Sequence, residues 1–144
     1  MKSGADNNPG PRIQTRRFAS RAELNAALVD RLIRALTEAN RSGPPRAVML
    51  SGGSTPIPVY RVVATRKPRA AGTVVVMFTD ERYVPQDNEA SNYFQSRPLL
   101  DALALPKERV LRVRTELSLQ EAAEDYERRI FTLLNSGGTI GLGL

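Results

Sequence analysis

The sequence contains no cysteine, no histidine and no tryptophan among its 144 residues. Without cysteine the chain has no disulfide bonds, no thiolate chemistry and no cysteine-based zinc site. Histidine is the side chain that most often carries protons near neutral pH, and it is a common metal ligand. Any acid–base catalysis by this chain must therefore use Asp, Glu, Tyr or Lys. We expect neither a metal site nor a cofactor.

Long apolar runs are also missing. No window approaches the roughly 18 apolar residues that a membrane span needs. The first 17 residues are polar and lack the apolar central segment of a signal peptide. We therefore expect a cytoplasmic protein with no membrane partner.

Hydrophobic residues make up 41% of the chain, which is enough for the core of one domain. Residues 1–11 are rich in glycine, proline and asparagine and cannot build a packed element. We predict a loose tail over 1–11 and one α/β unit over 12–144.

The formal net charge is +6, and the only lysines are Lys2, Lys67 and Lys107. An excess of arginine raises the question of nucleic acid binding. However, the arginines are spread along the chain without a run longer than a pair, and acidic residues are interspersed in the expected helices. We predict a small anionic ligand rather than nucleic acid, and keep a nucleic-acid binder as an alternative.

Hydrophobic periodicity and capping signals predict alternating strands and helices. The expected strands are a possible edge strand at 13–18, then 47–50, 73–79, 109–113 and 138–144. The strand at 138–144 is expected to be buried, like the one at 73–79, which is covered on both faces. The expected helices begin at Ser20, Pro56, Ser91 and Ser118. The first of these ends near Gly43, and Pro98 bends or restarts the third. Such alternation is typical of an α/β fold with a parallel sheet.

The stretch from Leu50 to Pro56 combines a strand end, a small-residue turn and a helix start. Gly52 and Gly53 leave backbone N–H groups uncovered, and the Thr55 hydroxyl is expected to cap the helix. Backbone donors at a helix N-terminus favour an anion such as phosphate. A tight strand-to-helix turn without any ligand is the alternative. The stretch is neither a Walker A loop nor a Gly-x-Gly-x-x-Gly fingerprint.

A second signal follows the strand at 73–79, where Asp80, Glu81 and Arg82 place three charges at its carboxyl end. Charged groups next to a buried strand have a desolvation cost unless they are paired or used. The planar guanidinium of Arg82 suits a phosphate or an oxyanion, and Asp80 or Glu81 could hold it in place. A salt-bridged strand end without function is the alternative. Ligands in open α/β sheets bind at the carboxyl ends of the strands.

Three motifs together resemble the 6-phosphogluconolactonase family: Ser-Gly-Gly-Ser-Thr-Pro at 51–56, Asp-Glu-Arg-Tyr-Val-Pro at 80–85 and Ser-Asn-Tyr at 91–93. The likeness runs from about Phe18 to Leu144. The related glucosamine-6-phosphate deaminases look similar but differ at the positions of Gly53, Arg82 and Asn92. The resemblance implies a Rossmann-like three-layer sandwich with a mainly parallel sheet, as in the NagB/RpiA/CoA-transferase-like proteins.

The resemblance implies hydrolysis of 6-phosphoglucono-1,5-lactone to 6-phosphogluconate in the pentose phosphate pathway. By likeness, Gly52, Gly53, Ser54 and Thr55 would surround a sugar-phosphate substrate. Arg82 would hold its phosphate or polarise its lactone, and Asp80 would position the loop. These two residues are the expected catalytic pair. Ser91 and Asn92 would order the edge of the site or contact the substrate.

The family's last motif, Gly-x-Gly-x-Asp-Gly-His, is matched here only by its opening, Gly141-Leu142-Gly143. The missing histidine is the family's expected general base, and a positioned base contributes about 10²–10⁴-fold to a rate. We therefore expect the chain to be the amino-terminal part of a lactonase with little turnover of its own. The alternatives are a sugar-phosphate-binding module without chemistry and a deaminase-like enzyme. The oligomeric state is left open.

Overall fold

The computed structural model describes residues 13–38 and 42–144. The loose tail expected at 1–11 lies outside the described residues. The elements, in chain order, are α1 (Arg21–Thr37), β1 (Arg46–Leu50), α2 (Pro56–Arg66), β2 (Val74–Phe78), α3 (Asn92–Leu103), the 3₁₀ helix η1 (Lys107–Arg109), β3 (Val110–Leu111), α4 (Leu119–Asn135) and β4 (Thr139–Gly143). No helix among them is long and apolar enough to cross a membrane.

The four strands form one parallel sheet in the order β3-β2-β1-β4. Arg46 to Leu50 of β1 pair residue by residue with Val74 to Phe78 of β2. The pairing of β1 with β4 has a bulge, because Ala47 faces Ile140 and Val48 faces Leu142, which leaves Gly141 as the extra residue. The predicted α/β class with a parallel sheet is confirmed.

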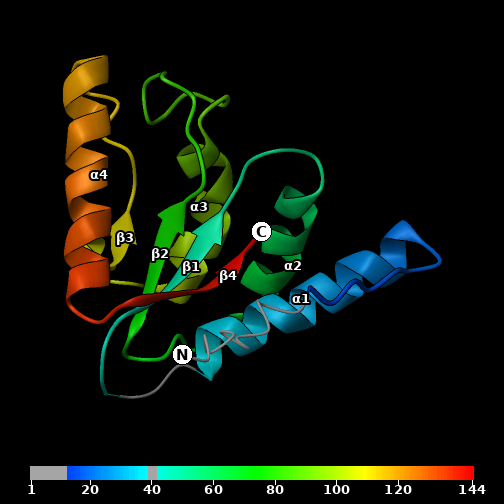
Figure 1. The fold of residues 1–144 in the computed structure, drawn as a ribbon. Coiled ribbons are helices and arrows are strands. Elements are labelled where there is room, and N and C mark those ends of the chain that lie inside the picture. Colours follow the sequence, from blue (N-terminus) through cyan, green and yellow to red (C-terminus); the bar gives the residue numbers. More distant parts are fainter. Residues whose placement is uncertain (1–12, 39–41) are drawn as a thin grey trace, which may run out of the picture.

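Helices cover both faces of the sheet (Figure 1). One face of β1 and β2, represented by Val48 and Val76, packs under α1, α2 and α3. The opposite face, represented by Ala47 and Met77, packs under α4. All five residues of β2 are buried, as their unbroken apolar run predicts. The result is the three-layer sandwich implied by the resemblance.

The order of the strands fixes where a ligand is expected. The chain moves outward from β1 to β2 and β3, then returns through α4 to place β4 on the other side of β1. Right-handed crossovers put α2 and α3 on one face and α4 on the other, because the direction of travel reverses. The reversal lies beside β1, and ligands of such sheets bind at the carboxyl ends of the strands next to it. The turn after β1 occupies this place.

The beginning of the described chain departs from the prediction. Residues 13–18 form no strand, and the Ile13 side chain is 93% exposed, so nothing in the described part of the sheet pairs with it. Helix α1 ends at Thr37, where the Glu38 N–H donates to the Arg34 carbonyl at 2.8 Å. The expected end at Gly43 is therefore too late, and residues 39–41 lie outside the described residues.

Two strands also differ from the prediction. The strand expected at 109–113 shortens to Val110–Leu111, because η1 takes up the residues before it. The strand expected at 138–144 forms as β4 but is not buried, and Ile140 is 47% exposed. It is an edge strand of the described sheet, so only one side has a neighbour. Pro98 does not restart its helix, since α3 is continuous to Leu103.

Candidate active site

The turn after β1 is held at its first residue by a tyrosine from α2. The Tyr60 hydroxyl accepts a hydrogen bond from the Ser51 N–H at 3.0 Å and donates one to the Ser51 carbonyl at 3.1 Å. Tyr60 is 1% exposed, and burial raises its pKa to about 12. The sequence analysis did not foresee this bond. The neutral phenol therefore fixes where the turn begins.

After Ser51 the turn leaves its backbone donors unused. The N–H groups of Gly52, Gly53, Ser54 and Thr55 donate to no acceptor among residues 13–38 and 42–144. Gly53 has a φ of +108°, a conformation that favours glycine. Pro56 opens α2 as expected, and it needs no N–H partner at that position. The turn thus presents unsatisfied donors at the N-terminus of α2, which suits an anion.

The expected cap by Thr55 is wrong. Thr55 occupies the N-cap position of α2 but has helical dihedral angles, and its side chain makes no capping hydrogen bond. A capping hydroxyl normally needs an extended backbone at this position. The Thr55 hydroxyl therefore does not cap α2, and it leaves the backbone N–H groups at the start of the helix uncapped.

The third motif touches the first directly. A Cβ atom at Gly52 would clash with Asn92 Oδ1, so a larger residue fits there only if the Asn92 side chain moves. The Asn92 Nδ2 group donates to the Asp80 carbonyl at 3.1 Å. Asn92 is 2% exposed, and its position at the start of α3 is fixed by helix packing. One amide side chain therefore joins the turn after β1 to the loop after β2.

Glu81 holds the loop after β2 against the N-terminus of α3. Its carboxylate accepts hydrogen bonds from the backbone N–H groups of Asn92 at 2.6 Å and Tyr93 at 3.0 Å, and from Ser91 Oγ at 3.1 Å. It also accepts the Arg82 N–H at 2.7 Å. A carboxylate at a helix N-terminus is favoured by the helix dipole. Ser91 is the N-cap of α3 and accepts the Phe94 N–H at 3.2 Å.

Arg82 and Asp80 are both exposed, on either side of this anchor. The Arg82 guanidinium makes no hydrogen bond or ion pair with any described residue, so neither Asp80 nor Glu81 holds it as the sequence suggested. Among the described residues, the Asp80 carboxylate accepts only the Thr79 hydroxyl, at 2.9 Å. The alternative of a salt-bridged strand end finds no support in the described residues. Arg82 is thus an exposed cation that has no side-chain partner among residues 13–38 and 42–144.

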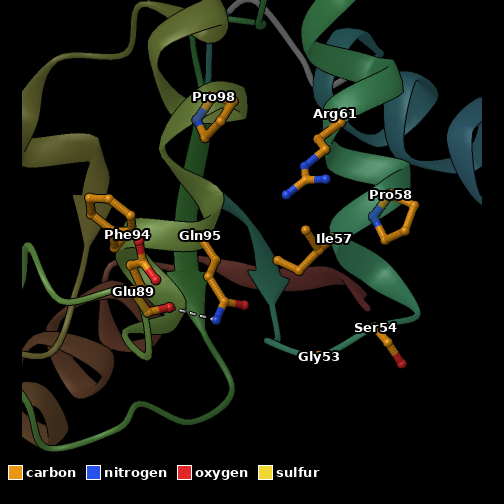
Figure 2. A pocket seen from close by; sticks show the side chains of 9 residues that line it. All are labelled: Gly53, Ser54, Ile57, Pro58, Arg61, Glu89, Phe94, Gln95 and Pro98. Carbon is orange, nitrogen blue, oxygen red and sulfur yellow. Dashed lines mark hydrogen bonds between the residues drawn. The ribbon is translucent and has the colours of Figure 1, made fainter.

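A hollow of about 710 Å³ adjoins the turn, between α2 and α3 (Figure 2). Gly53 and Ser54 form one end, and Arg61 of α2 reaches into the space between the two helices. Opposite Arg61, the Gln95 amide donates to the Glu89 carbonyl at 2.9 Å. The hollow includes only Gly53 and Ser54 of the residues predicted for the site. Outside the hollow, Gly52 and the Asp80 carbonyl contact the Asn92 side chain, and Ser91 shares the Glu81 carboxylate with the Asn92 N–H, whereas no described contact joins Thr55 or the Arg82 guanidinium to them.

The sequence analysis found the three motifs and missed what joins them. Asn92 and Ser91 were predicted at the edge of the site, and the structure places both of them, buried, at the N-terminus of α3. The anchoring role of Glu81 and the bond from Tyr60 to Ser51 were missed, because both join residues nine or more positions apart. Arg61 was missed as well, since an arginine on an exposed helix face carries no signal in one sequence.

Comparisons with known proteins identify the family of this chain. The family model described as glucosamine-6-phosphate isomerases/6-phosphogluconolactonase matches residues 19–142. A human 6-phosphogluconolactonase is 34% identical over 119 residues, which is 78% of this chain and 46% of the human protein. A Thermotoga maritima 6-phosphogluconolactonase is 39% identical over 84 residues, 58% of this chain and 38% of the relative. The chain spans less than half the length of these curated relatives.

Solved structures show the same fold. The crystal structure of 6-phosphogluconolactonase from Thermotoga maritima superimposes with a TM-score of 0.64 at 31% identity, over 75% of this chain and 50% of that one. The 6-phosphogluconolactonase from Trypanosoma cruzi gives a TM-score of 0.65 at 28% identity, over 80% of this chain and 48% of that one. The motifs, the parallel sheet and these likenesses agree: the chain belongs to the glucosamine-6-phosphate isomerase/6-phosphogluconolactonase family.

Proposed function

We propose that this chain supplies the sugar-phosphate-binding part of a 6-phosphogluconolactonase, and that its function is the hydrolysis of 6-phosphoglucono-1,5-lactone to 6-phosphogluconate in the pentose phosphate pathway. One observation carries the proposal. Asn92 touches Gly52 and donates to the Asp80 carbonyl, so the three motifs converge beside the point where the strand order reverses.

In this proposal the turn after β1 and Arg82 both bind the anionic substrate. The unused N–H groups of Gly52 to Thr55 and the dipole of α2 favour a negatively charged oxygen. The Arg82 guanidinium, which has no partner among the described residues, donates two parallel hydrogen bonds to a phosphate, or hydrogen bonds to the single oxygen of the lactone carbonyl. Ser91 and Asn92 act by holding the turn and the loop in register. Asp80 stays exposed beside Arg82, where it is available to the substrate or to water.

The chemistry needs one group that this sequence does not contain. Hydrolysis adds water to the lactone carbonyl, breaks the ring C–O bond and returns a proton to the ring oxygen. Donors at the developing oxyanion lower this barrier, and a positioned base that deprotonates the water contributes about 10²–10⁴-fold. The chain has no histidine for that role, and Glu81 is occupied by α3. We therefore propose that the 144-residue chain binds sugar phosphate but turns over lactone slowly.

Calorimetric titration with 6-phosphogluconate tests the binding half of the proposal. Arg82→Ala should weaken binding by about tenfold, the value of one charge-assisted contact. Arg31→Ala is the matched control, because it removes the same charge from an exposed position of α1. Equal binding by Arg82→Ala and the control would contradict the assignment.

A hydrolysis assay tests the catalytic half. The purified chain should hydrolyse 6-phosphoglucono-1,5-lactone at least about 10²-fold more slowly than a full-length relative, since the base is absent. A rate equal to that of the relative would show that another group, such as Asp80, is the base. Deamination of glucosamine 6-phosphate is the reaction of the other branch of the family, and we expect none.

A further inference from the structure

A second hollow, of about 650 Å³, lies on the β3 side of the sheet. It shares no lining residue with the hollow beside the glycine turn. Its walls come from α3, η1, α4 and the loop after β3, and they carry more cationic side chains than carboxylates. The cationic ones are Arg97, Lys107, Arg112, Arg114 and Arg129. Four separate segments thus bring positive charge to one cavity.

One of these arginines is already neutralised. Arg112 forms two hydrogen bonds with the carboxylate of Glu116, at 2.7 and 2.9 Å. Its guanidinium carbon lies 5.6 Å from the centre of the Tyr93 ring. The pairing raises the pKa of Arg112 and lowers that of Glu116 to about 2. The Arg112 side chain therefore lines the hollow in a fixed position, with its charge paired to that of Glu116.

The arginines around α4 are not fully neutralised. Asp125, which is 4% exposed, is the one carboxylate for three guanidinium groups: Arg128 at 2.6 Å, Arg129 at 3.0 Å and Arg114 at 3.5 Å. Burial lowers the pKa of Arg129, and the nearby charge of Arg114 lowers it further. Among residues 13–38 and 42–144, two positive charges of this cluster have no counterion, and Arg114 and Arg129 line the hollow.

The opposite wall adds further cations. Among the described residues, Arg97 and Lys107 form no ion pair. Asp87 and Asp101 also line the hollow and offset part of the charge without removing the excess. The rest of the lining consists of Gln86, Tyr93 and the apolar residues Leu100, Leu105 and Val110. The cavity therefore has cations on two walls and an apolar portion, in a volume typical of small-molecule sites, about 300–1,000 Å³.

We propose that this hollow binds a polyphosphate group, either free or as part of a nucleotide. A chain of phosphates carries more negative charge and is longer than a single phosphate, so it suits a cavity whose cations come from four separate segments. Arg114 and Arg129 have surplus charge on one side, and Arg97 and Lys107 supply donors on the other. This site is separate from the proposed sugar-phosphate site and does not depend on it.

Titration of the whole chain with sodium triphosphate at constant ionic strength tests the proposal. We expect saturable binding that Arg114→Ala and Arg97→Ala each weaken by about tenfold. The affinity of Arg114→Lys for triphosphate should lie between those of wild type and Arg114→Ala, because lysine keeps the charge but lacks the planar guanidinium. Both arginines are exposed, and a circular dichroism spectrum equal to wild type checks that the variants fold.

Two controls separate this site from general attraction and from the glycine turn. Arg31→Ala removes one charge from α1, and Arg82→Ala removes one from the candidate active site; both should bind triphosphate as wild type does. Conversely, Arg114→Ala should bind 6-phosphogluconate normally. The proposal is overturned if triphosphate does not saturate, if Arg31→Ala loses as much affinity as Arg114→Ala, or if Arg82→Ala alone abolishes binding.

The same titration with ATP identifies the source of the polyphosphate. If a nucleotide is the natural ligand, ATP should bind more tightly than triphosphate because its base and ribose contact the apolar lining. Equal affinity assigns the site to the phosphate chain alone. Orthophosphate at the same ionic strength should bind more weakly than either, and equal binding by orthophosphate would contradict a polyphosphate site.

Discussion

Glu81 connects three parts of the candidate site through one carboxylate. Its oxygens accept from Arg82, Ser91, Asn92 and Tyr93 at 2.6–3.1 Å. Two of these donors are the first N–H groups of α3. Glu81 therefore caps this helix from the loop after β2. The carboxylate of its neighbour Asp80 accepts only one hydroxyl from the part of the chain that the structure describes. Of these two adjacent carboxylates, Glu81 therefore holds the loop after β2 against α3, whereas Asp80 does not.

We predict that Glu81→Gln lowers the free energy of unfolding by about 2 kcal/mol. The amide loses the charge and one of the two acceptor oxygens, and hydrogen bonds to charged groups contribute about 1.5–3 kcal/mol each. Asp80→Asn is the matched control and should cost under about 0.5 kcal/mol, as exposed substitutions usually do. Urea unfolding of both variants measures the difference. Equal costs would show that Glu81 does not anchor α3.

Gly52 and Asn92 form the contact between the first and third motifs. We predict that Gly52→Ala destabilises the chain by about 2 kcal/mol, because its methyl group displaces Asn92 Oδ1 and breaks the bond to Asp80. In a double-mutant cycle, Gly52→Ala and Asn92→Ala should cost less together than the sum of the single changes, by at least about 1 kcal/mol.

Gly53→Ala supplies the comparison for this cycle. Nothing lies within 4 Å of a Cβ at Gly53, and its cost comes from the φ of +108° alone. Its effect should therefore add to that of Asn92→Ala without coupling. Coupling of equal size for Gly52 and Gly53 would mean that the contact with Asn92 is not what demands glycine at position 52.

At the scale of elements, α4 carries a buried charge on its inner face. Asp125 is paired with arginines on α4 and on the loop after β3. Asp125→Asn should destabilise the chain by about 3 kcal/mol, because it leaves the partly buried Arg129 without a counterion. The control Asp30→Asn breaks an exposed pair with Arg66 at 3.5 Å and should cost under about 1 kcal/mol. Thermal or urea unfolding distinguishes them, and similar costs would contradict a buried network.

The elements predicted from local signals were mostly placed correctly. The capping box at Ser118 and Glu121 forms with both of its hydrogen bonds, and the apolar run of β2 is buried throughout. The failures occur where tertiary neighbours decide. β4 lacks a second neighbour among the described strands and is half-exposed, and β3 gives residues to η1. Asp125 was missed because its partners come from two elements.

The candidate site also has features that the sequence predicted and features that depend on tertiary contacts. The sequence predicted which motifs carry it, since glycines and charged residues follow the ends of the strands. It could not predict which carboxylate holds α3, because Glu81 and Ser91 are brought together by the fold. It also misjudged Thr55, whose backbone conformation no residue type determines. The family resemblance therefore supplied the motifs, and the packing supplied the contacts between them.

At the scale of the whole molecule, a tyrosine from each helical layer secures one strand end. Tyr60 of α2 bonds both backbone groups of Ser51 after β1. Tyr126 of α4 accepts from the Phe78 N–H at 2.8 Å and donates to the Phe78 carbonyl at 2.5 Å. Since β3 pairs with β2 only at Val76 and Met77, the Tyr126 hydroxyl takes the place of the missing strand partner. Both layers thus fix the edge of the sheet that carries the site.

This arrangement predicts a loss of stability in alkali. Burial raises the pKa of Tyr60 to about 12 and also raises that of Tyr126, while an unfolded tyrosine titrates near 10. Above pH 10 the unfolded chain releases protons that the folded chain keeps, so the free energy of unfolding falls as pH rises from about 10 to 12. Between pH 8 and 11, wild type should lose about 1 kcal/mol more than Tyr60→Phe. Urea unfolding at both pH values measures this, and parallel losses would contradict it.

The central claim is that the three motifs converge on one sugar-phosphate site. Backbone amide NMR spectra of the ¹⁵N-labelled chain, recorded during titration with 6-phosphogluconate, test it most directly. We expect saturable shifts concentrated at residues 52–55, 80–82 and 91–92, with the amides around Arg114 unaffected. Shifts absent from the glycine turn, or confined to the arginine-lined hollow, would contradict the account.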